Sequence, residues 1–279
     1  MKRLFTLALL VAIAAMAWAQ VPAVDKAGGK NGFTFLQVTD PQIGFHKKGQ
    51  TLQWTIDNFE TMVQRINELK PSFVIITGDL IHRHFKPEQM EAYRRVVAKV
   101  SNDIPVFQIP GNHDMPKYAD EPRLLYLDAF GYDKFSFEYG DFGFIGINTN
   151  SLVCDTLPAR ADAVAQLQWL HGELERYKSK KGVFVFAHHP PVLAPGSPVK
   201  HKSEWDEPYR TQYISLMKQY NVTAIFDGHT HYGETTEIDG IPVFTTRASS
   251  LPLYGDTSGF LSITVAPDGT WTTKQLPLQ

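Results

Sequence analysis

The sequence is poor in cysteine: Cys154 is the only one among 279 residues. A chain with a single thiol cannot form a disulfide within itself, so the redox state of its compartment leaves no mark on the fold. Because 43% of the residues are hydrophobic and 20% are charged, the chain can bury a sizeable core. The composition therefore excludes a disulfide scaffold and a disordered chain.

After its first twenty residues the sequence also has no apolar run of the roughly 20 residues needed to span a bilayer. Those first residues have the order of a secretory signal: a basic KR pair, an apolar stretch from residue 4 to residue 15, and AWA before Gln20. We expect residues 1–19 to be a signal peptide, with an uncleaved membrane anchor as the alternative. The mature domain, residues 20–279, is then expected to be exported, periplasmic or secreted, and not attached to a membrane.

The sequence has no excess of positive charge. It contains 27 Lys and Arg residues against 29 Asp and Glu residues, with a formal net charge of −2 and no long basic run. This balance argues against a protein that binds nucleic acid through a basic face. The sequence also has no internal repeat, low-complexity tract or Gly/Ser linker that would divide the exported domain.

Short β-rich apolar runs alternate with amphipathic stretches along the chain. Residues 33–109 have the order strand, helix, strand, helix, strand, which is typical of a mainly parallel sheet. A second strand-rich half follows, and it ends in hairpins with Asp-Gly turns. These halves predict two packed sheets with helices outside. The expected strands are 33–39, 73–77, 106–109, 134–139, 142–148, 182–187, 222–227, 235–238, 241–246, 260–265 and 271–275, and the expected helices are 52–69, 87–100, 163–177 and 208–220.

Metal-capable side chains follow five of the apolar runs. In open α/β sheets the carboxyl ends of the strands line one crevice, so such residues would converge. Each motif alone is weak, because GD and GNHD are also turn sequences, although imidazoles have no turn-forming preference. All five in succession make an ordinary turn interpretation improbable. The residues are Asp40 and Gln42; Asp79; Asn112, His113 and Asp114; His188 and His189; and His229 and His231.

The residue types suit a pair of divalent cations. Two such ions about 3.5–4 Å apart can hold a phosphoryl group and activate a water between them. They need oxygen and imidazole ligands, one of which is shared, and a carboxylate suits the shared position. Neutral imidazole and amide ligands leave net positive charge for an anionic substrate. A glycine beside a ligand lets the backbone turn sharply, so that the side chain points back over the strand end.

With DPQ, GD, GNHD, a histidine after a strand and GHTH in this order, the sequence resembles the calcineurin-like metallophosphoesterases from about Phe33 to Thr273. The resemblance implies an α/β fold, a four-layer α/β/β/α sandwich of two mixed β-sheets. It also implies the ligands of two metal ions. Asp40, Gln42, Asp79 and His231 would hold the first ion, and Asp79, Asn112, His188 and His229 the second, with Asp79 bridging.

The resemblance further implies hydrolysis of a phosphomonoester by a hydroxide that the two ions share. His113 would donate a proton to the leaving oxygen and would be held in position by Asp114. The family pattern has a histidine where this sequence has Gln42, which makes the first site oxygen-rich and favours Mn or Fe, with Zn also possible. DPQ, GDL and the tandem histidines resemble the Ser/Thr phosphatase branch of calcineurin-like phosphoesterase-domain proteins.

Three segments after these motifs, residues 43–51, 80–86 and 190–209, are expected to shape the substrate pocket. His82 and Arg83 could contact the phosphate, and Trp205 could offer an aromatic platform, with solvated loop surface as the alternative. Arg247 could bind a phosphate oxygen, with a structural salt bridge as the alternative. We expect His189 to pack behind His188 without binding a metal.

The expected substrate is a phosphorylated small molecule or a phosphopeptide. Among the alternatives, the first is a phosphodiesterase acting on cyclic nucleotides or on nucleotide or lipid headgroup diesters. The second is a catalytically weak member that binds metal and phosphate, because Gln42 weakens one site. Retention of both His113 and Asp114 argues against this second alternative, since neither is needed merely to hold ions.

Overall fold

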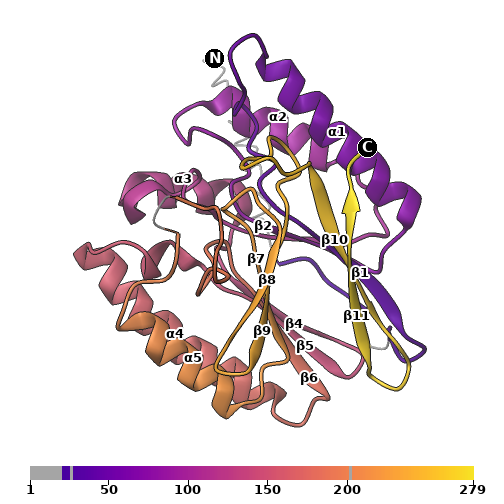
Figure 1. The fold of residues 1–279 in the computed structure, drawn as a ribbon, viewed down its shortest axis with the longest axis vertical. Helices are drawn as coiled ribbons and strands as arrows, with labels where there is room; N and C mark the ends of the chain where they lie inside the picture. The colour runs from indigo at the N-terminus through magenta and orange to yellow at the C-terminus, as the bar shows by residue number, and fades with distance from the viewer. Residues whose placement is uncertain (1–20, 26–27, 201–202) are drawn as a thin grey trace, which may run out of the picture.

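A computed structural model describes residues 21–25, 28–200 and 203–279, so the expected signal peptide, residues 1–19, lies outside the described residues. Two β-sheets pack face to face, with helices on the outer face of each (Figure 1). The first sheet has the strand order β11-β10-β1-β2-β3 and the second the order β4-β5-β6-β7-β9-β8. Both contain parallel and antiparallel pairs, which confirms the four-layer α/β/β/α sandwich of mixed sheets.

The five α-helices of the described chain are α1 (Leu52–Leu69), α2 (Pro87–Val97), α3 (Asp120–Phe130), α4 (Leu157–Tyr177) and α5 (Tyr209–Gln219), and the short 3₁₀ helices are η1 (Pro116–Tyr118) and η2 (Thr149–Leu152). The first sheet consists of β1 (Phe33–Val38), β2 (Val74–Thr77), β3 (Val106–Ile109), β10 (Gly259–Val265) and β11 (Trp271–Pro277). The second consists of β4 (Phe135–Tyr139), β5 (Phe142–Gly146), β6 (Gly182–Phe186), β7 (Ala224–Asp227), β8 (Glu234–Ile238) and β9 (Ile241–Thr245).

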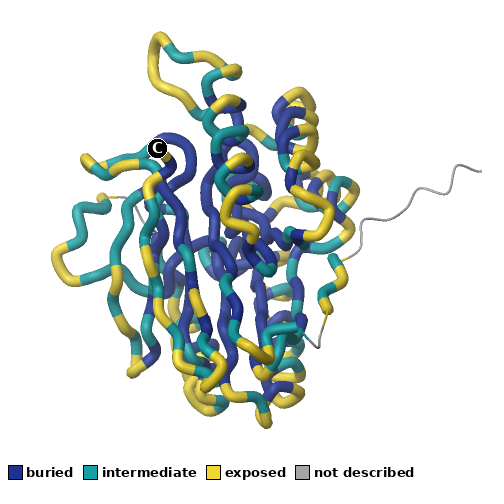
Figure 2. Tube along the Cα trace, turned by 90° about the vertical axis from the view of Figure 1, so that its right-hand side faces the viewer, coloured by how far each residue is buried: buried dark blue, intermediate teal, exposed yellow. Residues whose placement is uncertain are grey.

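Three hydrophobic clusters hold the layers together, and the buried strands run through the centre of the molecule (Figure 2). Helices α1 and α2 cover the first sheet, and α4 and α5 cover the second. The cluster between the sheets is rich in phenylalanine: Phe35 stacks on Phe73 at 5.1 Å between ring centroids, and Phe107 on Phe137 at 4.0 Å. This aromatic layer fixes the spacing of the two sheets.

Helix α1 shows how local sequence and burial agree. Thr51 caps its start by accepting a hydrogen bond from the Trp54 backbone N–H, and Lys70 ends it in the left-handed conformation. Its buried side chains, including Phe59, Val63 and Ile66, recur at helical spacing and face the first sheet.

Two helices differ most from expectation, and α2 ends at Val97 and not at residue 100. Helix α3 was not predicted, because its exposed positions include Leu124 and Leu125 while Pro122 and Tyr126 are buried, which hides the apolar periodicity. Helix α4 begins at Leu157 and not at residue 163, and the Thr156 side chain caps it there. No helix in the described ranges combines the length and apolar character that a membrane crossing requires.

The strand directions position the candidate site. Strands β1, β2 and β3 are mutually parallel, as are β5, β6 and β7. Their carboxyl ends meet across the two sheets, since the His188 imidazole after β6 hydrogen-bonds the Thr77 carbonyl at the end of β2. The five sequence motifs therefore leave the sheets at one end of the sandwich.

Candidate metal centre

The backbone at the strand ends takes an unusual conformation. Asp40, Gln42, Asp79, His229 and His231 have φ values of 51°, 37°, 48°, 68° and 55°. This left-handed region costs an L-residue about 1–2 kcal/mol, although Asp and His enter it more readily than most. Five expected metal ligands thus share a strained conformation, and such strain concentrates at functional sites.

The first group of side chains lies at the ends of β1, β2 and β7. Ligand atoms of Asp40, Asp79 and His231 all lie within 4.8 Å of one another, and His231 Nε2 is 3.3 Å from Asp40 Oδ1. The Gln42 amide nitrogen lies 3.4 Å from Asp79 Oδ2. Asp40 Oδ1 and Gln42 Oε1 are buried and have no hydrogen-bond partner among the described residues. A bound cation would satisfy both oxygens, so this donor set fits a metal ion.

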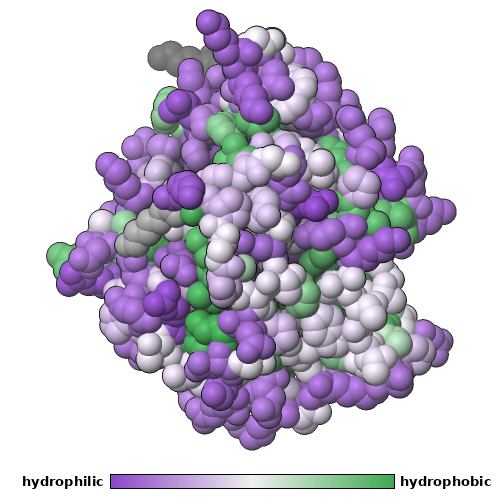
Figure 3. All heavy atoms as spheres, in the orientation of Figure 1, coloured by the Kyte–Doolittle hydropathy of each residue, from purple (hydrophilic) through white to green (hydrophobic). Residues whose placement is uncertain are grey.

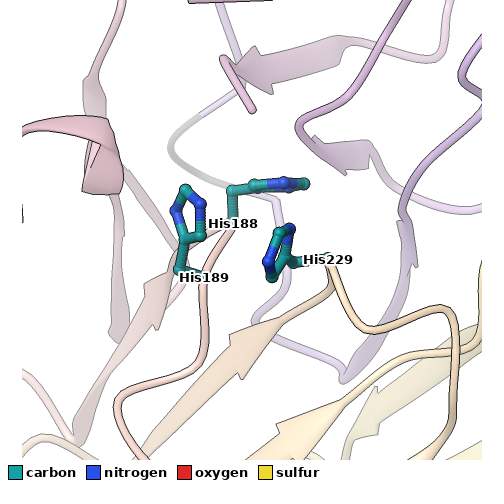
Figure 4. Close-up of side chains that lie close together, drawn as sticks. All are labelled: His188, His189 and His229. Atoms are coloured by element: carbon teal, nitrogen blue, oxygen red, sulfur yellow. The ribbon is translucent and has the colours of Figure 1, made fainter. Parts of the chain in front are cut away.

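The second group comes from β3, β6 and β7. His188, His189 and His229 bring ligand atoms within 4.8 Å of one another, and their rings lie together beyond the ends of β6 and β7 (Figure 4). His188 Nε2 lies 3.1 Å from Asn112 Oδ1 and 3.4 Å from Asp79 Oδ1. The two oxygens of Asp79 therefore face the two groups, as a shared ligand requires.

Backbone carbonyls set the tautomers of two of these histidines. His188 Nδ1 lies 2.8 Å from the Thr77 carbonyl oxygen, and His231 Nδ1 lies 2.5 Å from that of Leu251. Since a carbonyl only accepts, Nδ1 carries the proton in both rings, and the lone pair of Nε2 points toward the carboxylates. Both imidazoles are thus prepared to bind metal through Nε2.

Electrostatics favour a cation beside Asp40. Burial opposes its ionisation, but the His231 imidazole outweighs burial and holds the pKa of Asp40 below its usual range. Burial likewise lowers the pKa of His231, but the Asp40 carboxylate outweighs it and the net pKa is raised. A metal ion would take the place of the proton that the Asp40 carboxylate favours on His231, because a metal-binding imidazole must be neutral.

The structure corrects the expected partner of His113. Its Nδ1 donates to the His82 carbonyl oxygen at 2.8 Å, and its backbone N–H donates to Asp79 Oδ1 at 2.8 Å. The buried Asp114 carboxylate instead accepts from the backbone N–H groups of Gly111, Leu80 and Ile81 at 2.8–3.2 Å. Asp114 therefore supports His113 indirectly: it binds the backbone of Leu80 and Ile81, and this segment continues to the His82 carbonyl that accepts the His113 hydrogen bond.

Of the residues expected to contact substrate, His82 lies beside His113, whereas Arg247 and Trp205 are held by other contacts. His82 packs against His113, with ring centroids 4.7 Å apart, and Arg83 beside it is exposed. Arg247 forms an ion pair with Asp256 at 2.9 Å, which favours the salt-bridge alternative for this residue. Trp205 is only 1% exposed and donates its indole N–H to the His189 carbonyl, so the interpretation as an open aromatic platform was wrong. The large indole removes much apolar surface from water in this position.

Residues behind the ligands could only partly be predicted. The Asn150 side-chain amide donates to the Gly111 carbonyl at 3.2 Å. The Ser250 hydroxyl donates to the Asp40 carbonyl at 2.7 Å, and the Thr39 hydroxyl donates to Asp40 Oδ2 at 2.6 Å. Sequence reasoning missed this pair, because a serine in a loop and a threonine at a strand end carry no spacing signal.

His189, expected to pack behind His188, takes part in the same cluster. Its ring stands at 84° to that of His188, with 4.8 Å between centroids, and its Nδ1 lies 2.9 Å from the Thr149 hydroxyl. Thr149 also accepts a hydrogen bond from the His189 backbone N–H. These contacts anchor one side of the imidazole in the fold.

Residues 33–233 match the calcineurin-like phosphoesterase family over more than half of the chain. The chain belongs to this family. It is 28% identical over 282 residues to the serine/threonine-protein phosphatase CPPED1 of Homo sapiens, covering 90% of this chain and 85% of that protein. It is 25% identical over 252 residues to a 3',5'-cyclic-nucleotide phosphodiesterase of Nostoc sp., covering 85% and 90%.

Solved structures share the fold at low sequence identity. A dimetal phosphatase from Danio rerio aligns with a TM-score of 0.63 and 16% identity, covering 88% of this chain and 96% of that one. Purple acid phosphatase PPD1 from yellow lupin seeds aligns with a TM-score of 0.67 and 13% identity, covering 92% and 53%. Family membership and the converging ligands together make this calcineurin-like phosphoesterase a metal-dependent phosphohydrolase.

Proposed function

We propose that this enzyme hydrolyses phosphomonoesters at a dinuclear metal centre. The observation that carries the proposal is the position of Asp79, whose two carboxylate oxygens face two separate groups of metal-capable side chains. Asp40, Gln42, Asp79 and His231 would hold the first ion, and Asp79, Asn112, His188 and His229 the second. When bound, two divalent ions supply positive charge for the phosphoryl group and an activated water as the nucleophile.

The charge of the ligand set supports a monoester. The proposed ligands include only two carboxylates, those of Asp40 and Asp79, so two divalent cations would keep net positive charge at the site. A monoester dianion gains more from that charge than a diester monoanion does. The first site, with oxygen ligands and the single imidazole of His231, favours Mn or Fe, with Zn also compatible.

His113 is the proposed proton donor. Its Nδ1 hydrogen bond to the His82 carbonyl leaves Nε2 as the position from which a proton can move to the leaving oxygen. Its backbone N–H also ties it to Asp79, so the ring is held near the proposed shared ligand. The chemistry assigned to the chain's own residues is thus protonation of the leaving group by His113, besides the binding of the two ions.

A phosphodiesterase is the second candidate, and the similarity to the cyclic-nucleotide phosphodiesterase of Nostoc sp. favours it. The substrate class can be measured with purified protein reconstituted with Mn²⁺. Substrates would be p-nitrophenyl phosphate, bis(p-nitrophenyl) phosphate, a phosphoserine peptide and 3',5'-cyclic AMP. The proposal expects higher kcat/KM for the two monoesters. Faster hydrolysis of the two diesters would establish the second candidate in its place.

The role of His113 needs a variant pair. His113→Ala should keep its metal content but lose about 10²–10⁴-fold in kcat, as expected for loss of a proton-transfer group. His171→Ala is a suitable control, because His171 lies exposed on helix α4 and contacts Tyr220. Loss of metal from His113→Ala, or full activity on a poor leaving group, would contradict the role.

Export also belongs to the proposal, and the order of residues 1–20 supports it. Expression in a bacterial host followed by fractionation and mass spectrometry tests it. A mature chain that begins at Gln20 in the exported fraction is expected, whereas an intact chain in the cytoplasm would reject it.

A further inference from the structure

The segments after β1 and β2 stay paired beyond the ends of their strands. The backbone N–H of Gln42 donates to the Asp79 carbonyl at 2.8 Å, and that of Ile43 donates to the Leu80 carbonyl at 3.1 Å. The His82 N–H then donates back to the Ile43 carbonyl at 3.0 Å. These bonds extend the parallel pairing of β1 and β2 toward the metal centre, so the two loops are joined by backbone hydrogen bonds.

The paired loops bring three rings into a row. Phe45 stacks on His82 with 5.1 Å between ring centroids and an interplanar angle of 30°. The other stacked partner of His82 is His113, at 4.7 Å and 29°. Phe45 also presents an edge-to-face contact to the ligand His231, at 5.6 Å and 82°. The row therefore connects a proposed metal ligand to the proposed proton donor.

His82 contacts both Phe45 and His113 through stacking of its imidazole ring. Burial, together with the neighbouring His113 and Arg83, lowers the pKa of His82 to about 4, so the ring is neutral at ordinary pH. Its Nδ1 is buried without a hydrogen-bond partner in the described part of the chain. A neutral ring can stack on His113 without repelling the protonated form that a proton donor requires. Meanwhile the His82 backbone carbonyl binds His113 Nδ1.

We propose that Phe45 and His82 are positioning residues that fix the ring of His113 for protonation of the leaving group. The proposal rests on the proposed function. Phe45 supports one face of His82, His82 supports His113, and the shared backbone pairing holds both loops. This assigns His82 to the orientation of His113 and not to direct contact with phosphate, and it adds Phe45 to the residues that determine catalysis.

A leaving-group series separates this role from a general structural one. Kinetics would be measured with Mn²⁺-loaded enzyme on phosphate esters ranging from p-nitrophenol, which leaves without protonation, to a simple alkyl alcohol, which needs it. The His82→Ala and Phe45→Leu variants remove ring contacts but keep the His82 carbonyl. We expect kcat on the alkyl ester to fall about 10- to 100-fold, as a small displacement of a catalytic group can cause, with a much smaller loss on the nitrophenyl ester.

Two variants sharpen the result. His82→Phe keeps an aromatic face but has no ring nitrogen, so it should recover most of the activity on the alkyl ester. His171→Ala is the matched control: it also removes an imidazole from a ring pair, since His171 lies 5.6 Å from Tyr220 between ring centroids, but it is exposed on helix α4, so it should match wild type on both esters.

Three results would overturn the proposal. The first is a His82→Phe variant as impaired as His82→Ala, which would show that a ring nitrogen is used. The second is an equal loss on both esters, and the third is loss of metal from either positioning variant. A metal-loaded wild type that hydrolyses neither ester would overturn the proposed function, and this proposal with it.

Discussion

Gly78 offers the sharpest test of how the backbone supports the site. It lies between the end of β2 and Asp79 with φ of 87°, a conformation that glycine adopts freely. A Cβ added there would lie 2.6 Å from His188 Nδ1 and 2.7 Å from the Gly111 backbone nitrogen. Alanine at this position must therefore displace His188 or the loop that carries Asn112.

The cost of Gly78→Ala has two parts. The left-handed backbone contributes about 1–2 kcal/mol for an L-residue, and forcing a methyl group into a filled space contributes about 1–3 kcal/mol. The free energy of unfolding should therefore fall by about 2–5 kcal/mol in urea denaturation. Both displaced groups belong to the second metal site, so metal content should also fall toward one ion per chain.

Gly240→Ala is the matched control. Gly240 has φ of 83°, but a Cβ there would meet nothing within 4 Å. This variant isolates the backbone term and should lose only about 1–2 kcal/mol, with full metal content. If Gly78→Ala were no less stable than Gly240→Ala and still bound two ions, the packing of His188 against Gly78 would have no part in forming the site.

Three further predictions concern the first metal site, acid stability and the core. Gln42→His should tighten the first site in a metal titration, because imidazole is the stronger ligand; unchanged affinity would count against ligation by Gln42. In metal-free protein the pKa of His82 is about 4 in the folded state, against 6.5 ordinarily. Between these two pH values the unfolded chain binds more protons than the folded one, so the free energy of unfolding decreases as the pH is lowered from 6.5 to 4. The His82→Asn variant should show a shallower fall between pH 7 and 4.5 in urea denaturation, and an identical fall would refute this source. Phe144→Ala should cost about 3–5 kcal/mol, since the ring is fully buried between the sheets, and a loss below about 1 kcal/mol would contradict that packing.

Much of the fold follows from periodic patterns in the sequence. The strands that end in metal-capable residues read as short apolar runs, and the structure places each run in one of the two sheets. The apolar stripe of α1 likewise predicted both of its bounds, Leu52 and Leu69. The helix was predictable because burial on one face leaves a regular spacing of apolar side chains, and the strands because burial on both faces leaves continuous apolar runs.

Where burial and hydropathy disagree, prediction from sequence failed. Helix α3 exposes Leu124 at 61% and buries Tyr126, so its pattern does not indicate a buried face. Trp205 sits in a long proline-rich segment that suggested an open loop, yet its indole packs in the core. Only tertiary contacts decide such positions.

The candidate site divides in the same way. Five strand ends with metal-capable side chains could be read from the sequence, and the family resemblance selected seven ligands among them. The structure brings these side chains together around Asp79. The supporting contacts could not be proposed, because they join residues far apart in the chain. Asp114 illustrates this point: the family resemblance implied that it holds His113, but its carboxylate binds the backbone of Leu80 and Ile81.

Most of the seven candidate ligands lie beneath the surface of the molecule. Hydrophilic and hydrophobic side chains are interspersed over the face shown in Figure 3, and the predicted ligands Asp40, Asp79 and His188 are almost fully buried. The site is therefore defined by side chains that converge at the strand ends.

Metal stoichiometry tests the central claim most directly. Elemental analysis of purified wild-type protein after equilibration with Mn²⁺ and removal of free metal should give about two ions per chain. Asp79→Asn, which removes the shared carboxylate, should retain less than one. A wild-type chain without stoichiometric metal, or an Asp79→Asn variant that keeps two ions, would contradict a dinuclear centre bridged by Asp79.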